Sequence, residues 1–220
     1  MIVANIASIK EKLPPNVQLV AVSKLQPPEA IMEAYATGQR HFGENRASEF
    51  LSKWAQLPKD IHWHFIGHLQ TNKVKMVTGK ANLIHSIDSE RLLYAINQEA
   101  AKQGTLQKCL LEIHIAKEES KTGFLWEEVQ KLVNDPQFHS LTSVTICGLM
   151  GMASFVSDIH QVRKEFQTLK CCFDHLKQTA FIDNPHFCHL SMGMSGDWPI
   201  AVEEGSTLIR IGSQIFDNND

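Results

Sequence analysis

The sequence lacks the long apolar stretch that a membrane span needs, and it lacks a secretion signal. No segment approaches roughly 20 consecutive apolar residues, and residues 1–16 show no basic region followed by a long apolar run. The five cysteines include no C-x-x-C pair, so neither a disulfide framework nor a zinc ribbon is indicated. We therefore expect a cytoplasmic protein, since disulfides belong mainly to oxidising compartments.

A basic stripe is also missing from the sequence. The formal net charge is −3 and the pI is near 6.4, whereas a surface for nucleic acid or anionic lipid needs clustered Lys and Arg. We thus expect no nucleic-acid partner and no membrane partner. What is present is an ordinary globular composition, with 43% hydrophobic and 20% charged residues and no break along the chain. This composition predicts one domain over residues 1–220.

Short apolar runs alternate with helical patterns along the chain. Eight runs have the length and composition of buried strands: 17–22, 40–42, 61–66, 83–86, 108–114, 144–149, 187–190 and 207–211. Helices are predicted around them at 1–12, 27–38, 44–56, 70–78, 89–102, 125–134, 158–178 and 197–204. Alternation of this kind favours a parallel α/β sheet. Eight units, with no nucleotide-binding glycine motif after any strand, favour a closed (β/α)8 TIM barrel over an open sheet.

Lys24 directly follows the first predicted strand. In a barrel the functional residues lie at the C-terminal ends of the strands, so this lysine is predicted to point into the barrel mouth beside apolar walls. Such surroundings lower the pKa of an ammonium group and leave a nucleophilic amine, which can form a Schiff base with a carbonyl cofactor. The alternative is a lysine that extends from a strand end into solvent. Position alone does not decide between the two.

Two Gly/Ser segments follow the last two predicted strands. Ser195 precedes a helix expected to begin near Asp197, so it can cap that helix while its hydroxyl faces an anion. Gly212 and Ser213 follow the last strand and can supply further N–H and hydroxyl donors. Phosphate sites in barrels use these same two loops. Ordinary turn chemistry explains either segment alone, but the two together favour a phosphate.

Arg210 lies inside an otherwise apolar strand, where a buried guanidinium needs a partner. One candidate is the ring nitrogen of a pyridine cofactor, to which arginine can only donate. That contact keeps the nitrogen unprotonated and makes the ring a weaker electron sink. The other candidate is an ion pair with Glu112 or another carboxylate.

Three histidines close together in the sequence raise the question of a metal. His62 and His64 share one face of a predicted strand, and His68 follows in the next loop, so the three are candidate zinc or iron ligands. No carboxylate cluster accompanies them, and packing or cofactor-lining histidines are the favoured interpretation. The neighbouring Cys171 and Cys172 lie in a predicted helix and are interpreted as packing residues.

Eight ordered segments resemble the pyridoxal phosphate homeostasis protein family, whose members are also called YggS-like proteins. They are 19–24 (LVAVSK), 42–46 (FGENR), 64–73 (HFIGHLQTNK), 86–88 (SID), 121–124 (KTGF), 148–152 (GLMGM), 190–195 (LSMGMS) and 209–212 (IRIG). The resemblance covers nearly the whole chain. It implies the barrel domain of the alanine racemases, the third fold type of the enzymes that use pyridoxal 5′-phosphate (PLP), without their second β domain.

The resemblance also implies a set of residues that bind PLP. The set is Lys24, Asn45, His64, Met150, Met152, Ser195, Arg210, Gly212 and Ser213. Within it, Lys24 carries PLP as a Schiff base, Asn45 lies beside the cofactor, Arg210 meets the pyridine nitrogen, and the last two loops hold the phosphate. Position 213 is often threonine in the family and is serine here, which keeps the hydroxyl. No catalytic residue and no metal ligand are predicted.

Two function classes follow from this resemblance. A racemase needs acid–base groups on both faces of the substrate carbon, and the second base of alanine racemase is a tyrosine near its second domain. Tyr35 and Tyr94, the only tyrosines here, fall in predicted helices away from the strand ends. We therefore favour a non-catalytic PLP binder for PLP homeostasis and amino-acid and vitamin B6 balance, with a PLP-dependent amino-acid racemase of low activity as the alternative. Expected partners are PLP, apo-forms of PLP enzymes or a regulatory protein, and a monomer is expected.

Overall fold

The strands close into a single parallel barrel. The computed structural model describes residues 1–118 and 122–217. Its strands pair in sequence order from β1 to β8, and β8 returns to pair with β1. The strands are β1 Gln18–Val22, β2 His41–Glu44, β3 His62–Phe65, β4 Leu83–Ile87, β5 Gln107–Glu112, β6 Val144–Met150, β7 His189–Ser191 and β8 Leu208–Ile211. The predicted (β/α)8 TIM barrel is confirmed.

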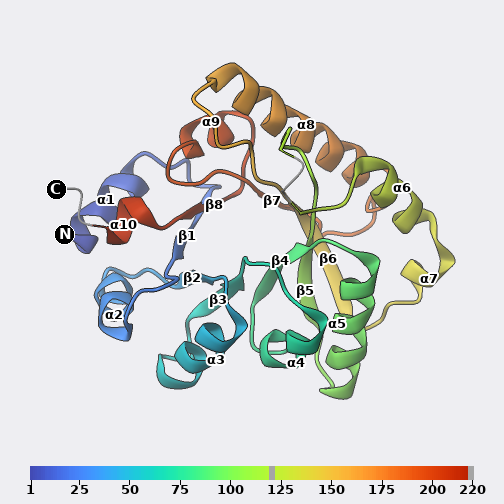
Figure 1. Cartoon of the computed structure of the whole chain (residues 1–220), viewed down its shortest axis with the longest axis horizontal. Helices are drawn as coiled ribbons and strands as arrows, with labels where there is room; N and C mark the ends of the chain where they lie inside the picture. The colour runs from blue at the N-terminus through green and yellow to red at the C-terminus, as the bar shows by residue number, and fades with distance from the viewer. Residues whose placement is uncertain (119–121, 218–220) are drawn as a thin grey trace.

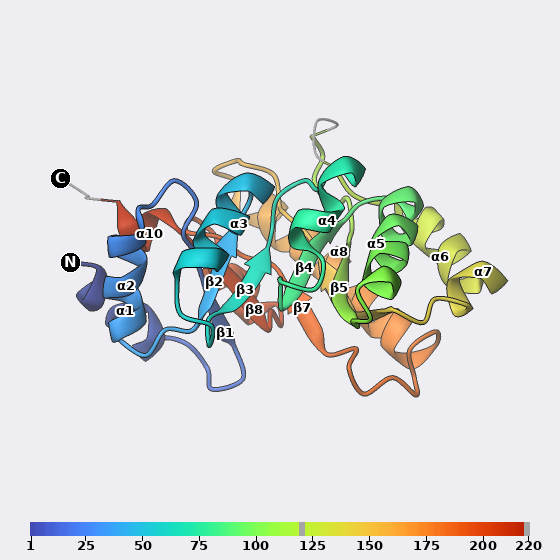
Figure 2. The same cartoon turned by 90° about the horizontal axis from the view of Figure 1, so that it is seen from below.

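Helices surround the strands in Figure 1, and Figure 2 shows the barrel from the side. They are α1 Ile2–Glu11, α2 Pro28–Ala36, α3 Ala47–Gln56, η1 Thr71–Lys73, α4 Val74–Val77, α5 Glu90–Lys102, α6 Trp126–Asn134, α7 Pro136–His139, α8 Ile159–Gln178, α9 Trp198–Glu203 and α10 Ser213–Phe216. The last helix packs on the first, and Asn5 Nδ2 donates to the carbonyl of Ile215 at 3.1 Å. Among the described residues, no helix is both long and apolar enough to cross a bilayer.

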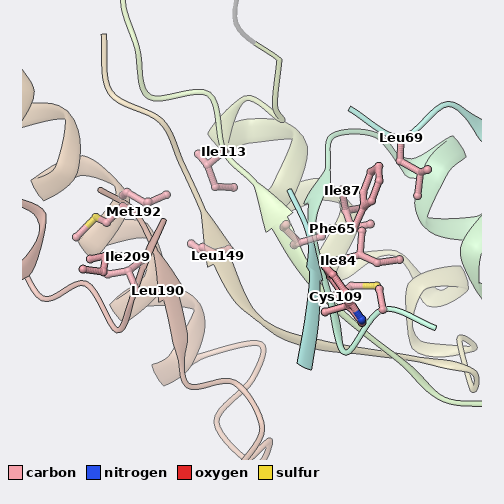
Figure 3. Close-up of a cluster of buried hydrophobic side chains, with 14 of the residues drawn as sticks. Phe65, Leu69, Ile84, Ile87, Cys109, Ile113, Leu149, Leu190, Met192 and Ile209 are labelled. Carbon is pink, nitrogen blue, oxygen red and sulfur yellow. The ribbon is translucent and has the colours of Figure 1, made fainter. Parts of the chain in front are cut away.

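Each strand divides its side chains between two cores. Leu19 and Ala21 of β1 belong to a large apolar cluster that the strands share with the helices, part of which appears in Figure 3. Val20, which points the other way, belongs to a smaller cluster inside the barrel. Phe50 joins α3 to the outer face of β3, because its ring makes T-shaped contacts with the rings of Trp63 and Phe65.

The barrel interior is apolar only in part. Its apolar cluster consists of Val20, Leu83, Leu110, Cys147, Met150 and Leu208. The same interior also holds the buried polar side chains of His64, His85, Ser191 and Arg210, which form hydrogen bonds with one another across the barrel. Polar groups that are buried this deeply need partners within the protein.

Several predicted boundaries differ from the structure. β2 continues to Glu44, two residues beyond the expected end, and Ser23 and Lys53 both donate to Oε1 of its buried carboxylate. The predicted stop at Asp135 is also the start of α7, since the Asp135 side chain accepts from the N–H of Gln137 and Pro136 occupies the first turn. β7 begins at His189 rather than at 187, and the helix expected over 70–78 consists of η1 and α4. Lys121, the first residue of segment 121–124, lies outside the described residues.

Candidate functional site

A cavity of about 920 Å³ opens at the C-terminal ends of the strands. Its lining comes from many parts of the barrel, including Val22 at the end of β1, Glu112 at the end of β5 and Arg210 in β8. Ile66 and Gly67, which follow β3, also line it. The C-terminal end of the strands is where TIM barrels carry their functional sites, so this cavity is the candidate site.

The structure gathers most of the predicted binding residues around this one cavity. Seven of the nine line it: Lys24, Asn45, Met152, Ser195, Arg210, Gly212 and Ser213. The other two are absent from the described lining. His64 and Met150 are buried inside the barrel, with 2% and 1% of their surface exposed.

Lys24 lies at the cavity but is more open than its position after a strand predicts. The preceding Ser23 is fully buried, whereas the side chain of Lys24 is exposed. The apolar enclosure expected around it is therefore not found. The next residue, Leu25, has φ of +64°, a left-handed conformation that is strained for a side chain with a Cβ. This turn directs the chain away from β1 immediately after the lysine.

A cluster of buried polar side chains lies at the end of β1, just before the turn that follows Lys24. Lys53 Nζ on α3 lies 2.9 Å from Glu44 Oε1 and 2.7 Å from Glu49 Oε1, and it donates to the carbonyl of Ser23 at 2.7 Å. Ser23 Oγ donates to the same Glu44 oxygen at 2.6 Å. Burial raises the pKa of Glu44, while the hydrogen bonds from Ser23 and Lys53 act in the opposite direction. The cluster ties the end of β1 to α3.

Arg210 lies at the floor of the cavity with 4% of its surface exposed. Its Nη1 donates to Ser191 Oγ at 2.6 Å and its Nη2 to the carbonyl of Gly151 at 3.1 Å. Burial lowers the pKa of Arg210 to about 10. The described residues show no ion pair between Arg210 and Glu112 within contact distance, and the Glu112 carboxylate accepts from Thr122 Oγ1 at 2.9 Å. Two of the five N–H groups of a guanidinium are thus used within the protein.

Ser195 and Ser213 lie at the cavity, but the capping role predicted for Ser195 is wrong. The residue that precedes α9 is Asp197, and its Oδ1 accepts from the N–H of Met194 at 2.6 Å. Between Ser195 and Asp197, Gly196 leaves open space, since a Cβ added there would meet no atom within 4 Å. The two hydroxyls and this space suit a ligand with an anionic end.

Asn45 shows an unused hydrogen-bonding group. Its Oδ1 is buried and has no partner among the described residues, which is rare in a native structure unless a ligand or water takes the place. The backbone is crowded here, since a Cβ on Gly67 would lie 2.2 Å from the carbonyl oxygen of Asn45. The backbone of Asn45 is therefore packed closely against Gly67 at the cavity.

The histidines of β3 do not converge on a metal. Both ring nitrogens of His64 bond to other histidines, Nε2 to His41 at 2.9 Å and Nδ1 to His85 at 2.8 Å. His68 pairs with Asp88, at 2.7 Å from Nδ1 to Oδ2. Within residues 1–118 and 122–217, no group of three or more His, Cys, Asp or Glu side chains is arranged for a metal ion.

Sequence reasoning missed several polar residues at and below the cavity. It named His68 only as a candidate metal ligand and Glu112 only as a candidate partner of Arg210. It assigned no individual role to Asp88, Thr122, His41, His85 or Ser191. The available signal was the period of two along each strand, which places alternate side chains inside the barrel. Using that signal requires the register between strands, which the sequence does not show.

Comparisons with known proteins agree on one family. The family profile for the alanine racemase N-terminal domain matches residues 1–219. A pyridoxal phosphate homeostasis protein from Aquifex aeolicus is 40% identical over 90% of this chain and 86% of its own length. PipY from Synechococcus elongatus is 39% identical to this chain, and the match covers 98% of this chain and all of PipY. The TM-score is 0.92 for the PipY structure without PLP and 0.88 for the structure with PLP bound. Alanine racemase from E. faecalis shares the fold, with 16% identity and a TM-score of 0.76. That match covers 99% of this chain and 58% of the racemase.

Proposed function

This chain belongs to the alanine racemase N-terminal domain family, and within it to the pyridoxal phosphate homeostasis proteins, and from that premise we propose that it binds PLP in the cavity at the strand ends. The proposal is supported by the PLP-bound structure of its relative PipY. Its role is to hold and buffer PLP inside the cell and so to maintain PLP, amino-acid and vitamin B6 balance.

The observation that carries the proposal is the presence of an amine and a buried guanidinium on one cavity. Lys24 supplies the amine at the mouth, and Arg210 supplies N–H groups at the floor. PLP would supply an aldehyde that condenses with an amine such as that of Lys24. The unpaired Oδ1 of Asn45 and the hydroxyls of Ser195 and Ser213 provide the remaining polar contacts. These residues fit the ring nitrogen, the ring substituents and the phosphate.

We further propose that the protein acts as a carrier and not as a racemase. Tyr35 lies on α2 and donates to Asp60 at 2.9 Å, and Tyr94 lies on α5, so neither is among the described residues that line the cavity. Arg210 offers only donors to a ring nitrogen, which disfavours protonation of that nitrogen and weakens the ring as an electron sink. The proposed recipients are apo-forms of PLP enzymes or a regulatory protein. A monomer in the cytoplasm, formed by one domain over residues 1–220, remains our prediction.

Reduction with borohydride tests the binding site. The protein is loaded with PLP, reduced, digested and mapped by mass spectrometry, with Lys24→Ala and the exposed Lys75→Ala as a matched pair. We expect one pyridoxyl adduct, on Lys24. Before reduction, Lys24→Ala should lack the yellow colour of the PLP-loaded protein, and Lys75→Ala should keep it. An adduct spread over surface lysines, or a yellow Lys24→Ala protein with unchanged affinity, overturns the proposal.

Exchange of the α-proton tests the carrier role. The PLP-loaded protein is incubated in deuterium oxide with several amino acids, and exchange at the α-carbon is followed by NMR. A carrier gives exchange no faster than that of free PLP at the same concentration. Faster exchange with any of the amino acids supports the racemase instead.

A further inference from the structure

A continuous chain of hydrogen bonds crosses the barrel interior and ends at Arg210. His41 Nδ1 lies 2.9 Å from His64 Nε2, and His64 Nδ1 lies 2.8 Å from His85 Nε2. His85 Nδ1 lies 2.9 Å from Ser191 Oγ, which accepts from Arg210 Nη1 at 2.6 Å. The five residues come from β2, β3, β4, β7 and β8, so the chain joins opposite walls of the barrel.

The chain is enclosed along most of its length. His85 and Ser191 are 0% exposed and His64 is 2% exposed. Only His41 is partly exposed, and its ring lies beside that of His62, with centroids 4.8 Å apart. In a medium of low polarity, hydrogen bonds of this kind are strong, and a missing partner is costly. Each residue of the chain therefore constrains the next.

Arginine fixes the direction of donation along the chain. A guanidinium can only donate, so Ser191 Oγ accepts from Arg210. The hydroxyl hydrogen of Ser191 then has one recorded acceptor among the described residues, Nδ1 of His85. A neutral imidazole that accepts at one nitrogen donates at the other. His85 thus donates from Nε2 to Nδ1 of His64, which in turn donates from Nε2 to Nδ1 of His41.

The electrostatic setting keeps these histidines neutral, as this order requires. Burial lowers the pKa of His64 and His85 well below the usual value. Burial, followed by the charges of His62, His189 and Lys10, lowers the pKa of His41 to about 4. Lys108 in turn lowers the pKa of His189 in addition to its burial. These neighbours come from α1, β3, β5 and β7, and all of them oppose a positive charge on the hydrogen-bonded histidines.

We propose that Ser191, His85 and His64 are positioning residues that hold Arg210 in place for the ring nitrogen of PLP. The hydroxyl of Ser191 is a good acceptor for Arg210 because its own hydrogen is directed to His85. With Nη1 and Nη2 anchored to Ser191 and Gly151, the remaining N–H groups of Arg210 are left for the cavity. The proposal rests on the proposed function, which assigns Arg210 to that nitrogen.

Matched variants test the chain. Ser191→Ala removes the hydroxyl, and His85→Leu removes both ring nitrogens, whereas His85→Gln keeps one acceptor and one donor. Cys147→Ala is the control, because it removes a small side chain from the same barrel interior outside the chain. We expect Ser191→Ala and His85→Leu to bind PLP about tenfold more weakly, the effect of losing a hydrogen bond to a charged group. The absorption maximum of bound PLP should also shift, while His85→Gln and Cys147→Ala should match the unmodified protein.

The outcomes separate this proposal from the proposed function. If Ser191→Ala and His85→Leu match Cys147→Ala in affinity and spectrum while borohydride still labels Lys24, the positioning role is wrong and PLP binding stands. If the unmodified protein shows no adduct on Lys24, the proposed function fails first. Histidine ¹⁵N NMR of the PLP-free protein adds a test that needs no variant. His64 and His85 should be neutral, with hydrogen on Nε2, between about pH 5 and pH 8. Hydrogen on Nδ1 of either ring would contradict the inferred direction of hydrogen bonding from Ser191 to His41.

Discussion

The backbone N–H of Leu25 donates to Oε1 of Glu49 at 2.7 Å, across the turn that follows Lys24. The same carboxylate oxygen lies 2.7 Å from Lys53 Nζ, so one oxygen joins the strained turn to the buried polar cluster. We predict that Glu49→Ala lowers the free energy of unfolding by about 1 kcal/mol and weakens PLP binding, because Lys24 loses the support of its neighbour. Urea unfolding and PLP titration measure the two effects.

Leu25→Gly is the matched control for that prediction. Glycine adopts a positive φ without strain but adds freedom to the unfolded chain, so the free energy of unfolding should change little. The hydrogen bond from residue 25 to Glu49 is kept, and PLP affinity should stay close to that of the unmodified protein. Equal PLP affinity in Glu49→Ala and Leu25→Gly would show that the turn does not position Lys24.

The barrel could be predicted because most of its strands are short, buried and largely apolar runs of sequence. Runs such as Leu19–Val22 are apolar on both faces, as strands of a parallel sheet between helices must be. Glu44 shows where this reasoning ends, since a charged residue argues against a buried strand until Lys53 is known to pair with it. α7 and α10 have only four residues each, too few for a helical period to be seen.

The candidate site was predictable at its rim and at Arg210 in its floor, but not in the hydrogen-bonded interior below the cavity. Lys24, Ser195 and Ser213 follow strands, and the rule that function lies at strand ends selects them. His85 and Ser191 lie within strands, and only the register of the closed barrel brings them together. Local sequence patterns carry no information on pairs that lie 106 residues apart in the chain.

Gly67 is predicted to tolerate no side chain. A Cβ there would lie 2.2 Å from the carbonyl oxygen of Asn45, so Gly67→Ala must displace the backbone beside the cavity. We expect a loss of about 1–3 kcal/mol in the free energy of unfolding, together with weaker PLP binding. Gly196→Ala is the control, since its Cβ meets nothing within 4 Å and stability should be unchanged. Thermal unfolding that ranks the two variants equally would contradict the crowding at Gly67.

Acid should destabilise the protein through its buried histidines. The pKa values of His64 and His85 are lowered by burial, so these rings stay neutral in the folded state while the unfolded chain protonates them below ~6.5. The unfolded state then binds more protons, and stability falls as the pH falls from that value. Each ring should cost about 1 kcal/mol per pH unit.

Urea unfolding at several pH values tests this dependence. His85→Gln removes one titrating ring but keeps a donor and an acceptor, so its stability should fall less steeply with acid than that of the unmodified protein. His160→Gln, at an exposed position, should leave the slope unchanged. Because the carboxylates are common to all three proteins, their contribution cancels in the comparison. Parallel slopes for all three would mean that His85 is not held neutral.

The hydroxyls of Ser195 and Ser213 should distinguish PLP from pyridoxal, which lacks the phosphate. Both line the cavity, and Ser195 directly precedes Gly196, whose open space is where we place the phosphate. Each change, Ser195→Ala or Ser213→Ala, should weaken PLP binding about tenfold, since a hydrogen bond to a charged group contributes about 1.5–3 kcal/mol. Pyridoxal binding should be unchanged in both variants, and Ser157→Ala, which also lies at the cavity, should affect neither ligand. Titrations followed by absorbance measure all the affinities, and an equal loss for the two ligands would place these hydroxyls on the ring instead of the phosphate.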